Sequence, residues 1–202
     1  MKVEPSDALI VVDVQNDFCP GGALPVDEGD RVVPVINQVM PLFEHIVFTR
    51  DWHPADHCSF AAPPEFTDGS WPAHCVANSP GAEFHGDLNV PADAIIINKG
   101  TASDKEAYSG FSGTSTEAAS YRPAADLAGQ LRKRGVLRVF VCGLATEYCV
   151  KQTALDGLKS GFKAALIENA CRGVNYPPGS AAKAVEEMRT AGVEVHWSRD
   201  LE

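Results

Sequence analysis

Short, continuous apolar runs recur along this chain of 202 residues and alternate with longer segments of helical periodicity. A run that is apolar at every position, such as residues 8–12 or 94–97, predicts a strand buried on both faces. Such strands are typical of parallel sheets that carry helices on both sides. The sequence therefore predicts a three-layer α/β/α fold around a central, mostly parallel sheet. Six strands are expected, at residues 8–12, 46–49, 94–97, 137–142, 162–168 and 193–197.

Apolar residues spaced three and four positions apart predict the helices between these strands. Four helices are expected, at residues 32–43, 124–134, 146–158 and 180–191. Because 45% of the residues are hydrophobic and no repeat or linker interrupts the pattern, we expect residues 1–202 to form a single domain. Residues 50–92 contain many prolines and histidines and little periodicity. A loop this long is usually functional, so we expect this insertion to bind a metal and to cover the site as a lid.

The net charge of −10 and the pI near 5.0 argue against two kinds of partner. A chain this acidic, without a block of Lys and Arg residues, is not expected to bind nucleic acid or an anionic membrane surface. The N-terminus lacks a signal pattern and every apolar run has the length of a strand, so neither export nor membrane insertion is expected. The six cysteines form no CxxC pair, which favours reduced thiols in the cytoplasm. Both a monomer and a homo-oligomer are compatible with the sequence.

Four residues of reactive types follow the carboxyl ends of predicted strands. Asp13 and Asp51 follow the first two strands, and Lys99 follows the third. Cys149 lies in the first turn of the helix after the fourth. Ligands bind beyond the carboxyl ends of parallel strands, so these side chains are expected to meet in one site. The first strand–helix turn lacks the GxGxxG glycines that hold a dinucleotide, and no nucleotide cofactor is expected.

Cys149 has the position of a nucleophile, because free amide groups and the positive end of a helix dipole lower the pKa of a thiol. Asp13 beside it is a candidate general base, and the Lys99 ammonium would favour the thiolate. Together these groups suit acyl transfer at a carbonyl such as an amide. Each residue also has an ordinary structural alternative: a buried packing cysteine, an aspartate that caps a turn, and a surface lysine.

The segment after the second strand contains one carboxylate and three imidazoles that are candidate metal ligands. They are Asp51, His53, His57 and His74. Carboxylate and imidazole groups in an irregular segment suit one divalent ion, Zn²⁺, Fe²⁺ or Mn²⁺, with water completing its shell. Isolated histidines are more often surface or hydrogen-bonded residues, so the spacing alone leaves both interpretations open.

Several segments carry a family resemblance: Val12–Cys19, Asp51-x-His53 with His57, Ser70–Val76, Lys99-Gly100 and Gly143–Val150. In this order they resemble the nicotinamidases of the isochorismatase-like cysteine hydrolase superfamily. The DVQNDF opening, the KG pair and GLATEYCV are typical of the superfamily, whereas DWH and WPAHC are typical of the nicotinamidase branch, which uses a metal. The resemblance implies an isochorismatase-like fold and hydrolysis of nicotinamide to nicotinate and ammonia in NAD salvage, with pyrazinamide as a further substrate.

The resemblance also implies a role for each residue around the thiol. Asp13 matches the family's base, Lys99 its charge stabiliser and Cys149 its nucleophile, which forms a thioester with the substrate. The Leu144–Ala145 bond matches a cis peptide of the family. The backbone amides of Ala145 and Cys149 match its oxyanion hole.

For the metal and the substrate ring, the resemblance implies a second set of residues. Asp51, His53 and His74 match the metal ligands, and His57 matches a ligand found in part of the family. The metal would hold the ring nitrogen and so position the amide at the thiol, rather than activate water. The aromatic walls that sandwich the ring match three residues, Phe18, Trp71 and Tyr108.

Three other functions are compatible with part of the pattern. Another amidase of the superfamily, acting on a carbamoyl or ureido substrate, would keep the thiol site but is not expected to hold a metal. A non-haem iron oxygenase would use two histidines and one carboxylate as ligands, but would leave Asp13, Lys99 and Cys149 without a role. A non-catalytic protein that binds nicotinamide would be expected to have lost part of the set.

Overall fold

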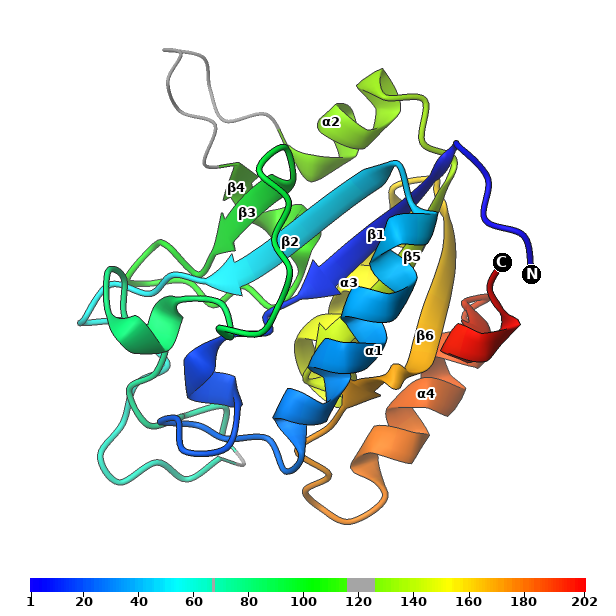
Figure 1. The fold of residues 1–202 in the computed structure, drawn as a ribbon. Helices are drawn as coiled ribbons and strands as arrows, with labels where there is room; N and C mark the ends of the chain where they lie inside the picture. The colour runs from blue at the N-terminus through cyan, green and yellow to red at the C-terminus, as the bar shows by residue number, and fades with distance from the viewer. Residues whose placement is uncertain (67, 116–125) are drawn as a thin grey trace.

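The computed structural model describes residues 1–66, 68–115 and 126–202. Within this part of the chain, one seven-stranded sheet forms the middle layer, with the strand order β4-β3-β2-β1-β5-β6-β7 (Figure 1). β4 runs antiparallel to β3, and the other six strands are parallel to one another. The strands are β1 (Asp7–Val12), β2 (His45–Asp51), β3 (Ile95–Lys99), β4 (Thr114–Ser115), β5 (Arg138–Leu144), β6 (Lys163–Arg172) and β7 (Glu194–His196).

The prediction of six strands in a mostly parallel sheet is confirmed, and two details of the sheet differ from it. β4 adds only two residues at the edge of β3, which is too short for a periodic pattern to indicate. β6 continues to Arg172, whereas the apolar pattern predicts an end at Glu168. The pairing of β6 with β5 shifts register between Val141 and Gly143, so polar residues in the middle of β6 lie at a bulge rather than at the end of the strand.

Helices cover both faces of the sheet, as the three-layer prediction requires (Figure 1). α1 (Val32–Val39) leads from β1 to β2, whereas α3 (Lys151–Lys159) and α4 (Ser180–Thr190) lead from β5 to β6 and from β6 to β7. These connections run in opposite directions along the sheet. Right-handed crossovers therefore place α1 on one face and the pair α3 and α4 on the other. α2 (Leu127–Lys133) precedes β5.

The helix boundaries agree with the expected ranges to within a few residues. α1 continues into a 3₁₀ turn at Met40–Leu42, because Pro41 interrupts the α-helical hydrogen bonding. The predicted helix at 146–158 begins with a π-helical turn, Thr146–Val150, and continues as α3. The predicted helix at 124–134 corresponds to α2, and residues 124 and 125 lie outside the described residues.

The hydrophobic core centres on β1, whose six residues are all buried. Phe48 of β2, Phe140 of β5 and Leu166 of β6 are fully buried as well. Burial on both faces explains why these strands appear as continuous apolar runs in the sequence. Among the described residues, no helix is both long enough and apolar enough to cross a membrane.

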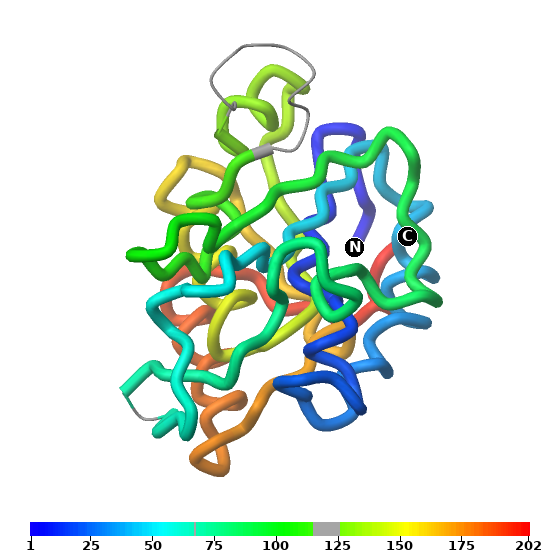
Figure 2. The backbone as a smooth tube through the Cα atoms, turned by 90° about the vertical axis from the view of Figure 1, so that its left-hand side faces the viewer, coloured from blue at the N-terminus to red at the C-terminus, as the bar shows by residue number. Residues whose placement is uncertain are grey.

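The long connection from β2 to β3 crosses one side of the molecule as irregular loops, coloured cyan to green in Figure 2. Its one short helical segment is a 3₁₀ turn at Pro80–Ala82, counting only the residues that the structure describes. Single β-bridges hold this connection together, and they join His53 to Val76 and Phe60 to Trp71. The connection starts beside the carboxyl end of β2, so its residues can complete a site formed there by the strands.

Candidate active site

The four reactive residues predicted at strand ends come from neighbouring positions across the sheet. Lys99 ends β3 and Asp51 ends β2, and these two residues are register partners. Asp13 follows β1, and Cys149 lies in the turn after β5. Because β3, β2, β1 and β5 are successive strands, their carboxyl ends lie side by side at the point where the strand order reverses. We refer to Asp13, Asp51, Lys99 and Cys149 as the strand-end cluster.

Lys99 contacts the other three residues of the cluster through its ammonium group. Its Nζ lies 2.9 Å from Asp13 Oδ2 and 3.2 Å from Cys149 Sγ, and it donates a hydrogen bond to Asp51 Oδ1. Burial by itself would lower the pKa of Lys99, but the two carboxylates outweigh burial and raise that pKa well above its usual value. Lys99 is therefore a permanent buried cation at the centre of the cluster.

Cys149 differs from the sequence prediction in its acidity. Burial raises the pKa of its thiol well above the usual value, and the nearby Lys99 ammonium opposes this effect without reversing it. The prediction of a lowered pKa was wrong because removal of the thiol from water, together with the nearby Asp13 and Asp51 carboxylates, outweighs the Lys99 cation. The thiol is thus protonated at rest, and it needs a base nearby if it is to attack.

Asp13 is the carboxylate placed to act as that base. Its side chain is fully buried, and a carboxylate oxygen of Asp13 lies within 4.8 Å of Cys149 Sγ. Thr49 Oγ1 donates a 2.7 Å hydrogen bond to Asp13 Oδ1 and fixes the carboxylate. Burial raises the pKa of Asp13, although Lys99 acts in the opposite direction. A carboxylate with a raised pKa is a better proton acceptor than an exposed one.

The turn that carries Cys149 has an unusual backbone. The Leu144–Ala145 peptide bond is cis, as the resemblance implies. The chain then enters the π-helical turn, in which Ala145 O accepts hydrogen bonds from the amides of Tyr148 and Val150. Ala145 and Cys149 both line the same cavity, so the two residues predicted to form an oxyanion hole lie at one site.

Three of the predicted metal ligands come together beside the cluster. The donor atoms of Asp51, His53 and His74 all lie within 4.8 Å of one another, and all three side chains are buried. His53 Nδ1 hydrogen-bonds to Gly100 O at 2.9 Å, and His74 Nδ1 hydrogen-bonds to Pro72 O at 2.8 Å. An imidazole that donates from Nδ1 keeps the Nε2 lone pair for a metal, so this donor set fits a divalent ion.

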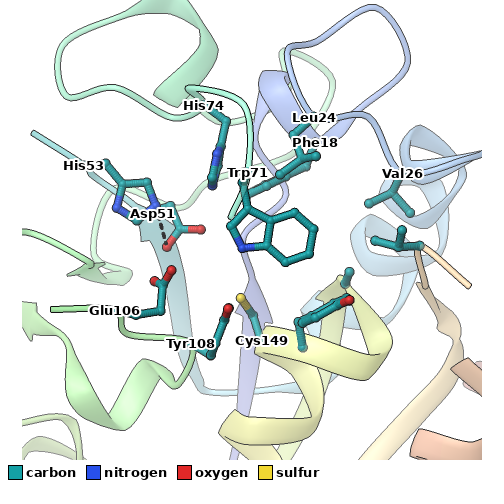
Figure 3. Close-up of a pocket in the computed structure, with 13 residues that line it drawn as sticks. Phe18, Leu24, Val26, Asp51, His53, Trp71, His74, Glu106, Tyr108 and Cys149 are labelled. Atoms are coloured by element: carbon teal, nitrogen blue, oxygen red, sulfur yellow. Dashed lines mark ion pairs between the residues drawn. The ribbon is translucent and has the colours of Figure 1, made fainter. Parts of the chain in front are cut away.

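His57, the fourth predicted ligand, is oriented differently. Its ring lies 4.1 Å from that of His53, centroid to centroid, but its Nε2 faces Lys105 O at 3.3 Å and its Nδ1 faces Ser59 Oγ at 2.8 Å. His57 forms a second group of potential donors with His53 and Glu106, rather than with Asp51 and His74. Figure 3 shows the Glu106 carboxylate turned toward Asp51 and His53.

A cavity opens beside the thiol (Figure 3). Cys149, Asp51, His53 and His74 line it together with the three predicted aromatic walls, Phe18, Trp71 and Tyr108. Asp13 and Lys99 lie behind this lining and are fully buried. The cavity therefore joins a thiol, a potential metal site and aromatic surfaces within reach of one small planar molecule.

Five residues that line this cavity were not predicted from the sequence, namely Leu24, Val26, Glu106, Tyr148 and Val174. Tyr148 precedes the candidate nucleophile and lies edge-on to Trp71, with ring centroids 5.3 Å apart. Its place beside Cys149 was the signal that could have found it. Glu106 and Val174 lie on irregular connections, and no local pattern in the sequence places them at the site.

Known proteins resemble this chain over almost its whole length. The Isochorismatase domain family matches residues 7–200. A nicotinamidase of Escherichia coli is 40% identical over an alignment of 213 positions. The alignment covers 98% of this chain and 98% of that protein. The family match spans every residue of the strand-end cluster.

Two solved structures share the fold. The pyrazinamidase of Pyrococcus horikoshii, solved in complex with zinc, has a TM-score of 0.81 and 49% sequence identity, and the match covers 96% of this chain and 99% of that chain. PnC1 from L. infantum, solved in complex with nicotinate, has a TM-score of 0.85 and 36% identity, with 100% of this chain and 98% of that chain covered.

Proposed function

Because this chain belongs to the isochorismatase family, we propose that its buried thiol site hydrolyses the amide group of nicotinamide to give nicotinate and ammonia. The observation that carries the proposal is the arrangement around Lys99, which contacts the candidate base Asp13 and the candidate nucleophile Cys149 beside a three-ligand metal site. The nicotinamidase relatives match nearly the full chain, and the zinc-containing pyrazinamidase shares its fold.

The chemistry begins with a proton transfer between two buried groups. Asp13 takes the proton of the Cys149 thiol as the sulfur attacks the amide carbon. The tetrahedral oxyanion that forms is held by the backbone amides of Ala145 and Cys149, and the Lys99 ammonium stabilises the negative charge of the cluster. The raised pKa of Asp13 suits this step, because Asp13 then holds the proton as a neutral acid.

Collapse of the intermediate breaks the carbon–nitrogen bond. Asp13 returns its proton to the leaving nitrogen, ammonia departs and a thioester remains on Cys149. A water molecule then attacks the thioester carbon, with Asp13 accepting its proton. The carbon–sulfur bond breaks and the sulfur recovers the proton from Asp13. The acid product leaves as nicotinate, having given its own proton to ammonia or solvent. The cycle consumes one water and leaves the enzyme unchanged.

A divalent ion is the cofactor that the donor set supports, and Asp51, His53 and His74 would hold it. When bound, the ion supplies a coordination position for the pyridine nitrogen of the substrate. The ion is Zn²⁺, Fe²⁺ or Mn²⁺, since two imidazoles and one carboxylate suit all three. Asp51 also accepts a hydrogen bond from Lys99, so it links the metal site to the cluster.

The aromatic residues select the substrate ring. Phe18, Trp71 and Tyr108 line the cavity and offer ring faces and edges to a flat heteroaromatic amide. Pyrazinamide, with a ring of the same size, is a further substrate. The reaction places the chain in NAD salvage, in a reducing cytoplasm where its six cysteines stay free. Residues 1–202 act as one domain in which residues 50–92 cover the site.

The test is ammonia release from nicotinamide by the purified protein, with bound metal quantified in the same sample. We expect release with about one divalent ion per chain, and we expect Cys149→Ala to abolish turnover while nicotinamide still binds in calorimetry. No release by the wild-type protein would overturn the proposal. Turnover in Cys149→Ala would overturn the choice of nucleophile. Release without any bound metal would instead favour an amidase of the metal-free type.

A further inference from the structure

Residues 173–179, which we call the rim loop, close one side of the cavity. Val174 lines the cavity beside the thiol. It also lines a second, outer cavity, which Tyr176 and Pro177 of the same loop border. The two cavities share Trp71 and Tyr148, so the rim loop forms part of the wall along the route to the site.

One carboxylate fastens this loop to the turn that carries the thiol. Glu147 lies two residues before Cys149 in the π-helical turn, and only 8% of it is exposed. Its Oε1 accepts hydrogen bonds from the Asn175 amide at 2.6 Å and from Ser180 Oγ at 3.2 Å. Its Oε2 accepts a hydrogen bond from the Val174 amide at 3.2 Å. The two amides belong to the rim loop, and Ser180 is the first residue of α4, directly after the loop.

The approach of the loop to this carboxylate is close enough to require a glycine. A Cβ atom at Gly173 would lie 2.5 Å from Glu147 Oε2 and 2.7 Å from the Cβ of Ala181. A side chain there would push the loop away from Glu147. The glycine at the base of the loop is therefore a second feature, besides the hydrogen bonds, that fits the close contact between the two segments.

We propose that Glu147 is a positioning residue for amide hydrolysis, which holds the rim loop, and with it Val174, against the cavity. It acts through the loop and does not line the cavity itself. A buried carboxylate is stable only when hydrogen-bond donors surround it, and here two donors come from the loop and the third from Ser180, where α4 begins. The inference rests on the proposed function for its substrate, whereas the attachment of the loop is independent of which amide is hydrolysed.

Two variants and one control test this role. Glu147→Ala removes both acceptor oxygens, and with them all three hydrogen bonds, and leaves the Val174 and Asn175 amides without these partners. Glu147→Gln keeps one oxygen for Asn175 and Ser180 but turns an NH₂ group toward the Val174 amide, and it keeps the shape of the side chain if the alanine variant fails to fold. The control is Asn169→Ala, which removes a similar attachment, two hydrogen bonds to Ser198, away from the cavity.

We expect both Glu147 variants to lose hydrogen-exchange protection at the Val174 and Asn175 amides, measured without substrate. The KM for nicotinamide should rise about tenfold in Glu147→Ala, as the loss of hydrogen bonds of ordinary strength predicts, with kcat within about twofold of wild type. Glu147→Gln should show a smaller rise, and Asn169→Ala none. Unchanged amide protection, or a fall in kcat at constant KM, would overturn the proposal. Failure of wild-type turnover would instead overturn the proposed function, because the exchange measurement does not depend on it.

Discussion

The strand-end cluster and the histidine-bearing loop after β2 position their side chains by different means. In the cluster, four neighbouring strands set the positions, and Lys99 lies 2.9 Å from Asp13 and 3.2 Å from Cys149. In the loop, His53 and His74 are oriented by hydrogen bonds to single backbone carbonyls. Asp51 belongs to both regions, since it ends β2 and groups with the two histidines.

Because of this difference, mutations in the two regions are expected to reduce different properties, folding stability in one and metal binding in the other. A buried ion pair that loses one partner leaves an uncompensated charge in the interior, so changes in the cluster cost folding stability as well as chemistry. A histidine in the loop is neutral when it binds a metal, and its removal leaves no buried charge behind. Changes in the loop are therefore expected to cost metal binding and to leave the fold intact.

The largest effect is expected at Lys99. Lys99→Met keeps the length of the side chain but leaves the carboxylates of Asp13 and Asp51 buried without their cation. We expect a loss of about 3–5 kcal/mol in the free energy of unfolding, measured by urea denaturation, together with loss of ammonia release. The matched control is Lys151→Met, which removes a partly exposed pair with Glu187 and should cost less than about 1 kcal/mol. Equal losses in both variants would contradict the coupling of the cluster to the fold.

The next largest effect is expected at Asp13, where Asp13→Asn keeps nearly the same shape but removes both the proton acceptor and the negative charge that pairs with Lys99. Asp13→Asn still accepts the hydrogen bond from Thr49 but cannot take the thiol proton. We expect kcat for nicotinamide to fall by about 10²–10⁴, with KM little changed, in steady-state kinetics. Alkylation of Cys149 by iodoacetamide should slow in parallel, since burial keeps the pKa of the thiol high. A kcat within tenfold of wild type would show that another group accepts the proton.

The same comparison explains which parts of the molecule could be predicted from the sequence. Buried parallel strands appear as continuous apolar runs, so the positions of Asp13 and Lys99 after such runs were visible without a structure. The acidity of Cys149 was predicted with the wrong sign, because the extent of its desolvation depends on packing that no local pattern records. Glu106 and Val174 reach the cavity from irregular connections, where backbone direction depends on tertiary contacts.

In the loop, substitution of His53 is expected to lower the metal affinity more than substitution of His57. It belongs to both groups of potential metal donors, the one with Asp51 and His74 and the one with His57 and Glu106. We expect His53→Ala to reduce the affinity for a divalent ion by more than the roughly 10–100-fold that loss of an outer-shell partner costs. Calorimetric titration of metal-free protein measures this, and the KM for nicotinamide should rise. A metal affinity equal to that of wild type would remove His53 from the ligand set.

The smallest effect is expected at His57, and it decides whether this residue is a fourth ligand. Its Nε2 faces Lys105 O and its Nδ1 faces Ser59 Oγ, so neither nitrogen points to the group formed by Asp51 and His74. We therefore expect His57→Ala to bind one divalent ion per chain with an affinity within about tenfold to 100-fold of wild type, as for a residue that supports a ligand. His53→Ala, measured in the same titration, is the matched comparison. If His57→Ala lost the metal as completely as His53→Ala, His57 would be a ligand, and its hydrogen bonds to Ser59 and Lys105 would have to break when the ion binds.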